Sequence, residues 1–298
     1  MTSTVDPPRA ATVGPAAAAR RSVRIAAYLL LTLGVLLYLG PFVIQLATSF
    51  KTDADAAAAP LSLIPDPVDL SAWHTAFGGD PTLPVPLGRW FTNSFVVTIS
   101  VTLGRLIFDS MAGYALARLR FRGRAPVAGT VLAVLAVPGV VLLIPKFLVL
   151  KELGMFNTYA GMIIPLCADA VGILFMRTAF EQVPYELEEA ALIDGAGVVR
   201  RFATVVLPLV QPALITITIL SFQASWNEFT HFLVATSDPD LATVNLGIAQ
   251  LTAGDLRGPS KFPLKLALAT LATLPVAVVF VIFQRYFVRG IGEGGVKG

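Results

Sequence analysis

The chain has 298 residues and is poor in the residue types on which soluble enzymes and metal proteins depend. Only 14% of its residues are charged, whereas a soluble domain has roughly 25%, so a soluble globular protein is excluded. Its one cysteine, Cys167, excludes a disulfide or a cysteine zinc site within the chain. Its two histidines, His74 and His231, lie too far apart in the sequence to predict a histidine metal site. No metal site is expected, and no G-x-x-x-x-G-K-[ST] loop is present to bind ATP.

Apolar residues are abundant instead. They make up 55% of the chain, and the mean hydropathy is +0.75. Since a transmembrane helix needs about 20 apolar residues, this composition predicts an all-α membrane protein. We expect six transmembrane helices, over residues 25–47, 90–116, 127–150, 159–180, 208–234 and 266–287. Proline inside a span indicates a kink or a break, and the prolines placed in this way are Pro41, Pro138, Pro145, Pro165, Pro212 and Pro275.

The segments around these spans differ in composition. Residues 1–23 are rich in alanine, proline and arginine without periodicity, which predicts a disordered cytoplasmic tail. Residues 24–50 contain an apolar run too long for a signal-peptide core, so we expect an uncleaved first helix, although the small residues after it resemble a cleavage site. Residues 51–89 hold aspartates and prolines and are predicted to be an irregular connection outside the bilayer. The remainder divides into a membrane-embedded core, 90–288, and a cytoplasmic C-terminal tail, 289–298.

The Lys and Arg residues are distributed unevenly between the two sides of the membrane. Six spans put both termini on one side, and that side holds roughly twice as many Lys and Arg residues as the other. Because loops rich in these residues face the cytoplasm, we expect a plasma-membrane protein with both termini in the cytoplasm. The arginines within residues 118–124 are interpreted as topology signals and headgroup anchors rather than as a nucleic-acid surface.

Residues 184–208, between the fourth and fifth spans, form a loop that is too long for a turn and too polar for a span. Pro184 suits the first position of a helix. The helix dipole favours anions in the turns that follow, where the sequence has Glu186, Glu188 and Glu189. Asp194-Gly195 would end this helix, because glycine accepts a positive φ, and residues 198–206 would form a second one. The pattern alone fits both a helix-turn-helix that docks another protein and an amphipathic hairpin that only links two spans.

The same loop contains a motif with highly specific spacing. It follows the pattern E-A-A-x3-G-x9-I-x-L-P, with one conservative departure, and its residues are Glu189, Ala190, Ala191, Gly195, Val205, Leu207 and Pro208. The motif resembles the EAA loop of ABC-importer permeases. That resemblance implies a cytoplasmic coupling loop that fits a cleft on an ATPase subunit and transmits its closure to the spans. Asp194 and Ala196, on either side of the turn glycine, belong to the same predicted contact surface.

Further matches extend the resemblance from about residue 90 to the C-terminus. They are Asn93-Ser94, the segment 115–124 that reads ALARLRFRGR, Trp226-Asn227-Glu228-Phe229 and the tail at 294–298 that reads GGVKG. Together they resemble the carbohydrate-importer subfamily, specifically its maltose-type six-span inner-membrane component. The fold that this resemblance implies is the type I transmembrane fold of ABC importers.

The resemblance also implies a function and partners. The chain would be a non-catalytic permease subunit that translocates a sugar or oligosaccharide delivered by an extracytoplasmic binding protein. Its other partners would be a second homologous permease, two ABC ATPase subunits and the lipid bilayer, with no nucleic acid. It would bind no cofactor, because ATP and Mg would be held by the ATPase subunits. The alternatives are an ABC permease for a non-sugar solute, such as a glycerophosphodiester, polyamine or peptide, and a stand-alone secondary transporter, which would need no docking loop.

Charged residues inside the predicted spans need an explanation, because an unpaired charge near the bilayer centre is unfavourable by several kcal/mol. Arg105 and Asp109 stand four residues apart in the second span, so we expect an intramembrane ion pair on one helix face, although a role in the translocation path is the alternative. Asp169, near the middle of the fourth span, either completes that cluster or accepts hydrogen bonds from a polar substrate.

The fifth span contains a polar stretch that could contact a sugar. The candidate residues for the substrate or the translocation path are Gln223, Trp226, Asn227 and Glu228. Amide and carboxylate groups match paired hydroxyls, and an indole ring packs on the C–H face of a sugar. The alternative is that Trp226 belongs to the aromatic belt at the membrane surface and that Glu228 caps the outer end of the span.

Overall fold

The structure is a computed structural model that describes residues 15–253 and 261–294. These residues form helices and connecting turns without a β-strand, which confirms the all-α prediction. Three helices, α1 (Pro15–Thr48), α4 (Leu87–Arg118) and α15 (Phe262–Gly294), each contain a segment long and apolar enough to cross a membrane. Three bent helix pairs pass the same test, so length and composition give up to six spans, as predicted.

The first two bent pairs were each predicted as one span, and each is interrupted; the third joins the second helix of the predicted loop, residues 198–206, to the start of the predicted fifth span, residues 208–234. The bends measure 101°, 41° and 85° in chain order. Pro138, Pro165 and Pro212 lie at or beside the three breaks, as expected for a residue that removes a backbone donor. The paired elements are α5 (Arg124–Leu135) with η1 (Gly139–Leu142) and α6 (Leu143–Glu152), α7 (Tyr159–Ile163) and η2 (Ile164–Leu166) with α8 (Ala170–Glu181), and α10 (Val198–Arg200), η3 (Arg201–Val206) and α11 (Leu207–Leu209) with α12 (Gln211–Trp226).

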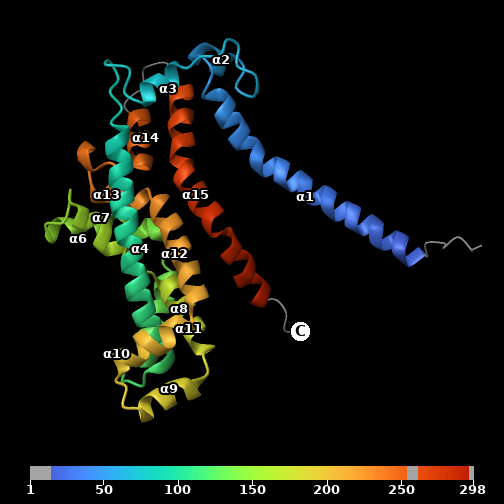
Figure 1. Cartoon of the computed structure of the whole chain (residues 1–298). Coiled ribbons are helices and arrows are strands. Elements are labelled where there is room, and N and C mark those ends of the chain that lie inside the picture. The colour runs from blue at the N-terminus through green and yellow to red at the C-terminus, as the bar shows by residue number, and fades with distance from the viewer. Residues whose placement is uncertain (1–14, 254–260, 295–298) are drawn as a thin grey trace, which may run out of the picture.

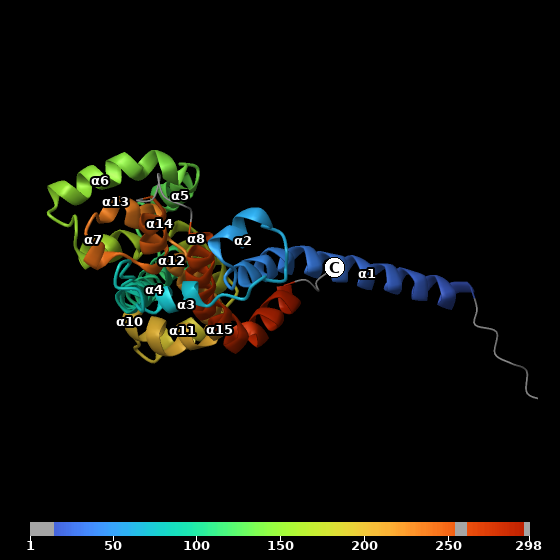
Figure 2. The same ribbon diagram turned by 90° about the horizontal axis from the view of Figure 1, so that it is seen from above.

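Helix α1 stands apart from the bundle and projects away from it (Figures 1 and 2). None of its most apolar window is buried, so this surface is left for lipid or another membrane protein. Its last turns contact α15, where Gln45 Nε2 donates a hydrogen bond of 3.1 Å to Thr270 Oγ1. The prediction of a disordered tail over residues 1–23 is wrong from Pro15 onward, because the helix begins there. Residues 1–14 lie outside the described residues.

The connection at residues 51–89 is more ordered than predicted. It contains two short helices, α2 (Asp53–Ala58) and α3 (Ser71–Ala76), and its last three residues already belong to α4. Within these two helices the buried residues are alanines, Ala56, Ala72 and Ala76, so the backbone approaches its neighbours closely. These helices lie at one end of the bundle, and α9 (Tyr185–Ile193) lies at the opposite end (Figure 1).

Helix α4 runs between the two ends and joins two apolar clusters. Val97 and Val101 are fully buried in the cluster nearer α3, and Tyr114 belongs to the cluster nearer α9. Glycine brings α4 and α8 into close contact: a Cβ atom on Gly113 would lie 2.8 Å from the backbone nitrogen of Arg177. Since real Cβ atoms do not approach so closely, only glycine fits there. Helix α4 also packs against α12, whereas α1 packs on α15.

The fifth span ends earlier than predicted. Helix α12 stops at Trp226, and the chain continues through three short elements, α13 (Thr230–Ala235), η4 (Pro239–Leu241) and α14 (Val244–Ala253). The start of α4 holds this segment in place. Asn93 Nδ2 donates to the carbonyls of Asp240 and Ala242, at 2.8 and 2.9 Å, and Ser94 Oγ accepts from the Val244 N–H at 2.9 Å.

The last span exceeds its predicted limits. Helix α15 contains the whole of residues 266–287 and continues to Gly294, so most of the predicted tail at 289–298 is helical. Residues 295–298 lie outside the described residues.

Candidate functional site

The loop at residues 184–208 contains a helix, a tight turn and a second helical segment, as predicted. Pro184 is the cap before α9 rather than its first residue. Asp194 ends the helix, and Gly195 has a left-handed φ of +79°. The Gly195 N–H donates to the Leu192 carbonyl at 3.0 Å, and the Ala196 N–H donates to the Ala191 carbonyl at 2.9 Å.

This pair of bonds is a Schellman closure, which satisfies the last carbonyls of a helix. It gives a structural reason for two positions of the motif, Gly195 and Ala191, and for the neighbouring Ala196. Gly195 takes the backbone conformation that a side chain disfavours, Ala191 accepts one closing bond, and Ala196 is 8% exposed beneath the turn. A Cβ atom on Gly195 would meet nothing within 4 Å of the chain itself. Space is therefore open on the outer side of the turn.

The tip of this turn presents apolar side chains to the outside. Ile193 is 86% exposed and Val199 is 79% exposed, one on each side of Gly195. Glu189 and Ala190 are also exposed, whereas Ala191 is half-buried. Apolar residues exposed together with small residues at a turn are typical of a surface that another protein covers.

The second half of the loop attaches this tip to the bundle. It is helical from Val198 to Leu209, and residues Arg201–Val206 form a π-helix, a form that is rare and frequent at functional sites. Val206 is fully buried, and the motif residues Val205 and Leu207 pack on the cluster nearer α9. Pro208 is exposed and does not begin the fifth span, because the chain breaks again before α12.

Two consecutive glutamates of α9 have opposite environments. Glu189, the motif residue, is exposed, but the Glu188 side chain is 3% exposed and points into the bundle. Glu188 Oε2 accepts a hydrogen bond of 2.9 Å from the Tyr114 hydroxyl. The other carboxylate oxygen lies 3.4 Å from the Nε of Arg118. A buried carboxylate requires such partners, because desolvation of an unpaired charge is highly unfavourable.

Arg118, the last residue of α4, is itself 7% exposed. Its Nε donates to the Phe180 carbonyl at 3.0 Å, and its Nη2 contacts the carbonyls of Phe180 and Val183. These carbonyls end α8, where a cation is favoured by the helix dipole. The interpretation of Arg118 as a headgroup anchor is therefore wrong, since this guanidinium joins the ends of α4, α8 and α9.

The predicted ion pair between Arg105 and Asp109 is wrong as well. Among the described residues, no salt bridge within 4.0 Å joins them. Arg105 Nε donates instead to the Leu166 carbonyl at 2.9 Å, and Asp109 Oδ1 accepts from the Asp169 N–H at 2.9 Å. Both partners are backbone groups freed by the break between η2 and α8. A break inside a membrane needs such partners, and the tertiary contact replaces the pairing expected along one helix.

Asp169 has two roles at the same break. It caps α8, since its Oδ2 accepts from the Gly172 N–H at 3.1 Å. It also remains half-buried, as does Arg105, whereas Asp109 is fully buried. Asp169 thus joins the cluster around Asp109, as one interpretation predicted, and its partial exposure leaves it open to a polar ligand.

The polar residues of the predicted fifth span separate into two groups. Trp226 is 3% exposed, and its Nε1 donates to the Ala272 carbonyl of α15 at 3.0 Å, so the ring lies in the bundle and not in an aromatic belt. Glu228 accepts from the His231 N–H at 2.7 Å, so it binds the first turn of α13 rather than capping the outer end of the span as the alternative predicted. Gln223 and Asn227 are exposed, and the Asn227 side chain donates to the Gln223 carbonyl at 2.9 Å.

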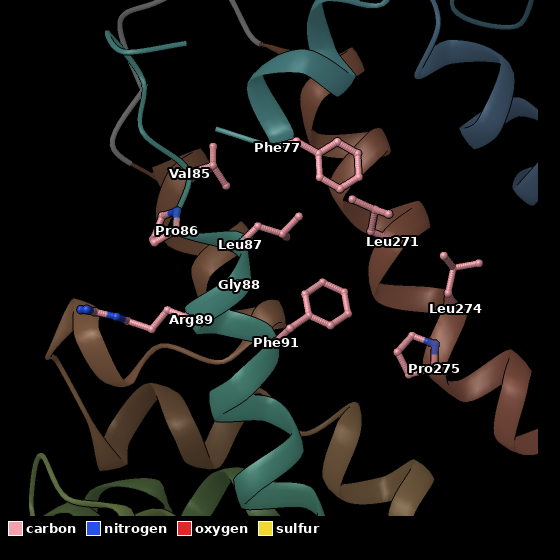
Figure 3. A pocket seen from close by; sticks show the side chains of 10 residues that line it. All are labelled: Phe77, Val85, Pro86, Leu87, Gly88, Arg89, Phe91, Leu271, Leu274 and Pro275. Carbon is pink, nitrogen blue, oxygen red and sulfur yellow. The ribbon is translucent and has the colours of Figure 1, made fainter. Parts of the chain in front are cut away.

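A cavity of about 490 Å³ lies elsewhere, between the start of α4 and the middle of α15 (Figure 3). Its lining is apolar apart from Arg89, which points away from the other labelled side chains and pairs with Asp240. None of the predicted substrate residues lines it. Its chemistry does not match a polyhydroxylated ligand.

An all-helical bundle with up to six candidate spans and an apolar hairpin exposed at one end defines the class of protein: a polytopic helical membrane protein. Residues 109–293 match the family model for the binding-protein-dependent transport system inner membrane component. The chain belongs to this family. It is the transmembrane permease subunit of an ABC importer, and an inner-membrane component that works with a binding protein.

Individual relatives agree over most of the chain. The sn-glycerol-3-phosphate transport system permease protein UgpE of Yersinia pestis is 32% identical, over 91% of this chain and 97% of its own length. The arabinooligosaccharides transport system permease protein AraQ of Halalkalibacterium halodurans is 35% identical, over 70% and 74%. A crystal structure of a bacterial ABC transporter involved in the import of the acidic polysaccharide alginate matches with a TM-score of 0.75 and 25% identity, over 90% of this chain and 98% of that one.

Sequence reasoning missed the buried residues that hold the 184–208 loop, Tyr114, Arg118 and Glu188. Glu188 differs from Glu189 only in helical phase, and α9 is too short for its periodicity to reveal the buried face. The arginines of the segment 118–124 look equivalent in sequence. The one available clue is position, since Arg118 ends the apolar run of α4 and the next three residues lie beyond the helix.

Proposed function

We propose that this permease translocates a sugar or sugar-like solute and is coupled to two separate ATPase subunits through residues 184–208, here called the coupling loop. In this proposal both termini and the coupling loop face the cytoplasm, as the Lys and Arg distribution predicts. A second homologous permease completes the path, and an extracytoplasmic binding protein delivers the solute. This chain hydrolyses nothing and holds no cofactor, since ATP and Mg belong to the ATPase subunits.

The observation that supports coupling most strongly is the exposed tip of the loop. Ile193 and Val199 flank a glycine turn that is closed internally by two hydrogen bonds, so the turn is rigid while its outer surface is apolar. An ATPase cleft that closed around this tip would bury both side chains and push on α9. Such rigid-body transmission is a recognised form of conformational coupling. The contact residues proposed are Glu189, Ala190, Ala191, Asp194, Gly195, Ala196, Leu207 and Pro208, together with Ile193 and Val199.

The proposed solute class follows from the relatives and from the polar groups along the spans. Glycerol phosphate, arabinooligosaccharides and alginate, which the relatives' names mention, are all rich in hydroxyl groups. Gln223, in the last turn of α12, and Asn227, just after that helix, are exposed, and Asp169 is half-buried at the break before α8. These residues are proposed to line the path. Trp226 would not contact the solute. It would instead hold α12 against α15, and these helices would border the path.

Replacement of Gly195 tests the coupling part of the proposal. Complexes carrying Gly195→Phe or Gly195→Asn are reconstituted in proteoliposomes, and uptake and ATP hydrolysis are measured together. Asparagine tolerates a positive φ, so Gly195→Asn should keep most uptake. Gly195→Phe should lower uptake per ATP hydrolysed about 5- to 150-fold, the range of typical coupling energies.

Gly154 provides the matched control. It also has a positive φ, of +64°, and open space around its Cβ position, but it lies in the turn after α6. Gly154→Phe carries similar backbone strain without blocking the coupling loop, so it should leave uptake per ATP unchanged. Wild-type coupling in Gly195→Phe would refute the proposed docking surface.

A phosphate-bearing polyol is the second candidate solute. The glycerol-3-phosphate permease is similar over nearly its whole length, and this solute class is close to the glycerophosphodiester alternative. Calorimetric titration of the partner binding protein with an oligosaccharide and with glycerol-3-phosphate separates the two candidates. Binding of the sugar alone supports the first candidate, and binding of the phosphate ester alone supports the second.

A further inference from the structure

The contact beneath the coupling loop is polar, as is the contact of Arg105 and Asp109 with the break in the fourth span. Most helix contacts in the bundle are apolar or use glycine, yet beneath the loop a carboxylate, a guanidinium and a phenol meet in the interior. Arg118 is 7% exposed and Glu188 is 3% exposed. The Tyr114 hydroxyl donates to Glu188 at 2.9 Å, and the Arg118 guanidinium binds the last carbonyls of α8. Three helix ends therefore share one set of polar bonds.

Aromatic packing alone would already fix the loop to the bundle. The ring of Tyr114 lies 5.1 Å from that of Phe202, in the π-helix, and 5.7 Å from that of Phe180, at the end of α8. Val206 and Val210 are buried beside them. Attachment thus does not require charges, and a buried ion pair is weak evidence for stability, because apolar residues of the same size often do as well. The charges need a different explanation.

The polar contacts fix the relative orientation of the helices, which apolar packing alone does not do. Apolar side chains slide past one another with little penalty, whereas a hydrogen bond weakens steeply as its angle changes. The directional bonds here are the one from the Tyr114 hydroxyl to Glu188 and those from the Arg118 guanidinium to the α8 carbonyls, while Arg118 and Glu188 meet as an ion pair at 3.4 Å. Glu188 faces α4 while the adjacent Glu189 faces outward. Helix α9 therefore has one face for an external partner and another that is tied to α4.

Helix α4, which carries Arg118, runs from one end of the bundle to the other. Arg118 is the last residue of α4, a helix of 32 residues. The same helix carries Arg105 and Asp109, which hold the break in the fourth span, and Asn93, which holds the segment before α14. A displacement of α9 passed to Arg118 would reach all these contacts through one continuous helix.

We propose that Arg118 and Glu188 are positioning residues that transmit movement of the coupling loop to α4. This inference rests on the proposed function and adds the route by which ATPase closure reaches the spans. It assigns Glu189 to the contact with the ATPase and Glu188 to the contact with the membrane core. The Tyr114 hydroxyl orients the Glu188 carboxylate for that contact.

The test compares Glu188→Gln, Arg118→Lys and Tyr114→Phe with the wild type in the reconstituted full complex. Two quantities are measured for the assembled complex: solute uptake per ATP hydrolysed, and cross-linking of a cysteine at position 193 to the ATPase subunit. Glutamine keeps the shape of Glu188 but loses its charge, lysine keeps the charge of Arg118 but loses its fork, and phenylalanine removes only the hydroxyl of Tyr114.

We expect uptake per ATP to fall at least about fivefold in Glu188→Gln and Arg118→Lys, and about twofold in Tyr114→Phe, while cross-linking at position 193 is kept. A purely structural role would lower the amount of assembled complex but leave uptake per ATP unchanged in what assembles. An unchanged ratio in every variant that assembles would overturn the proposal. Tyr114→Phe keeps its ring in the aromatic cluster and so serves as the decisive variant if the other two fail to assemble.

The same data separate this inference from the proposed function. If position 193 of the otherwise wild-type chain does not cross-link to the ATPase, the docking proposal itself fails. If it cross-links and the three variants transport with the normal ratio, docking stands and only the transmission route through Arg118 and Glu188 fails.

Discussion

Asp109 on α4 accepts a hydrogen bond of 2.9 Å from the backbone N–H of Asp169, the residue at which the fourth span is broken. Arg105, one turn earlier on α4, donates to the Leu166 carbonyl on the other side of the break. One helix therefore supplies an acceptor and a donor to the backbone groups that the break leaves free. This relationship explains why two charged residues are retained in an otherwise apolar span.

Asp109→Asn and Asp109→Ala should differ in stability. Asparagine keeps an oxygen that can accept from the Asp169 N–H, whereas alanine leaves that partly buried N–H without this partner, which is unfavourable by about 1–3 kcal/mol. We expect a clearly lower melting temperature for Asp109→Ala than for Asp109→Asn in purified, detergent-solubilised protein. Equal melting temperatures would show that acceptance of this hydrogen bond is not what Asp109 contributes.

Gly172→Ala should destabilise the same region for a steric reason. A Cβ atom at Gly172 would lie 2.1 Å from Asp109 Oδ2, well inside contact distance. Overpacking of this kind is unfavourable by about 1–3 kcal/mol. Gly129→Ala in α5 is the matched control, because a Cβ atom there meets nothing within 4 Å and alanine favours a helix. Thermal unfolding of both variants should show a loss for Gly172→Ala only, and a loss of similar size in both would contradict the predicted clash.

Trp226→Phe should affect stability without affecting solute affinity. Phenylalanine keeps an aromatic ring near Phe95, whose centroid is 4.9 Å away, but loses the hydrogen bond to Ala272. One net hydrogen bond is worth about 0.5–1.5 kcal/mol. We expect a modest fall in melting temperature and an unchanged KM for uptake in proteoliposomes. A large rise in KM at unchanged stability would instead place Trp226 in contact with the solute.

Asn93→Asp should loosen the segment between α13 and α14. The Asn93 amide donates to two backbone carbonyls and its oxygen accepts from the Tyr159 hydroxyl at 2.5 Å. An aspartate still accepts from the Tyr159 hydroxyl. Its second oxygen, however, cannot donate and would face the Asp240 and Ala242 carbonyl oxygens, which repel it. Amide hydrogen exchange over residues 238–244 should become faster, while exchange in α9 stays as in the wild type. Unchanged exchange over residues 238–244 would contradict this role.

Much of the architecture could be predicted from the sequence because bilayer thickness fixes the length of apolar runs. The breaks at Pro138 and Pro165 also follow from a local property of proline. The end of α12 at Trp226 could not be predicted in this way, since apolar residues continue into α13. Contacts with distant residues hold the chain there: Asn245 Nδ2 donates to the Trp226 carbonyl at 2.9 Å, and the His231 ring lies 3.0 Å from the Gly161 carbonyl.

The candidate site shows the same division between local and tertiary causes. Gly195 could be placed at the turn because its conformation is a property of one residue. The spacing of Arg105 and Asp109 indicated an ion pair, but the freed backbone of another span competes successfully for both side chains. Arg118 could not be recognised, because its partners are carbonyls that come together only when α8 ends beside α4.

Site-specific cross-linking at the tip of the coupling loop tests the central claim most directly. A single cysteine is introduced as Ile193→Cys or, as the control, Ile64→Cys in a chain that also carries Cys167→Ser. Both isoleucines are highly exposed, at 86% and 79%, but residue 64 belongs to the connection at the opposite end of the bundle. We predict that the cysteine at position 193 cross-links to the ATPase subunit, to an extent that changes with ATP, and that the cysteine at position 64 does not. Cross-linking at position 64 without any at position 193 would contradict both the docking surface and the orientation.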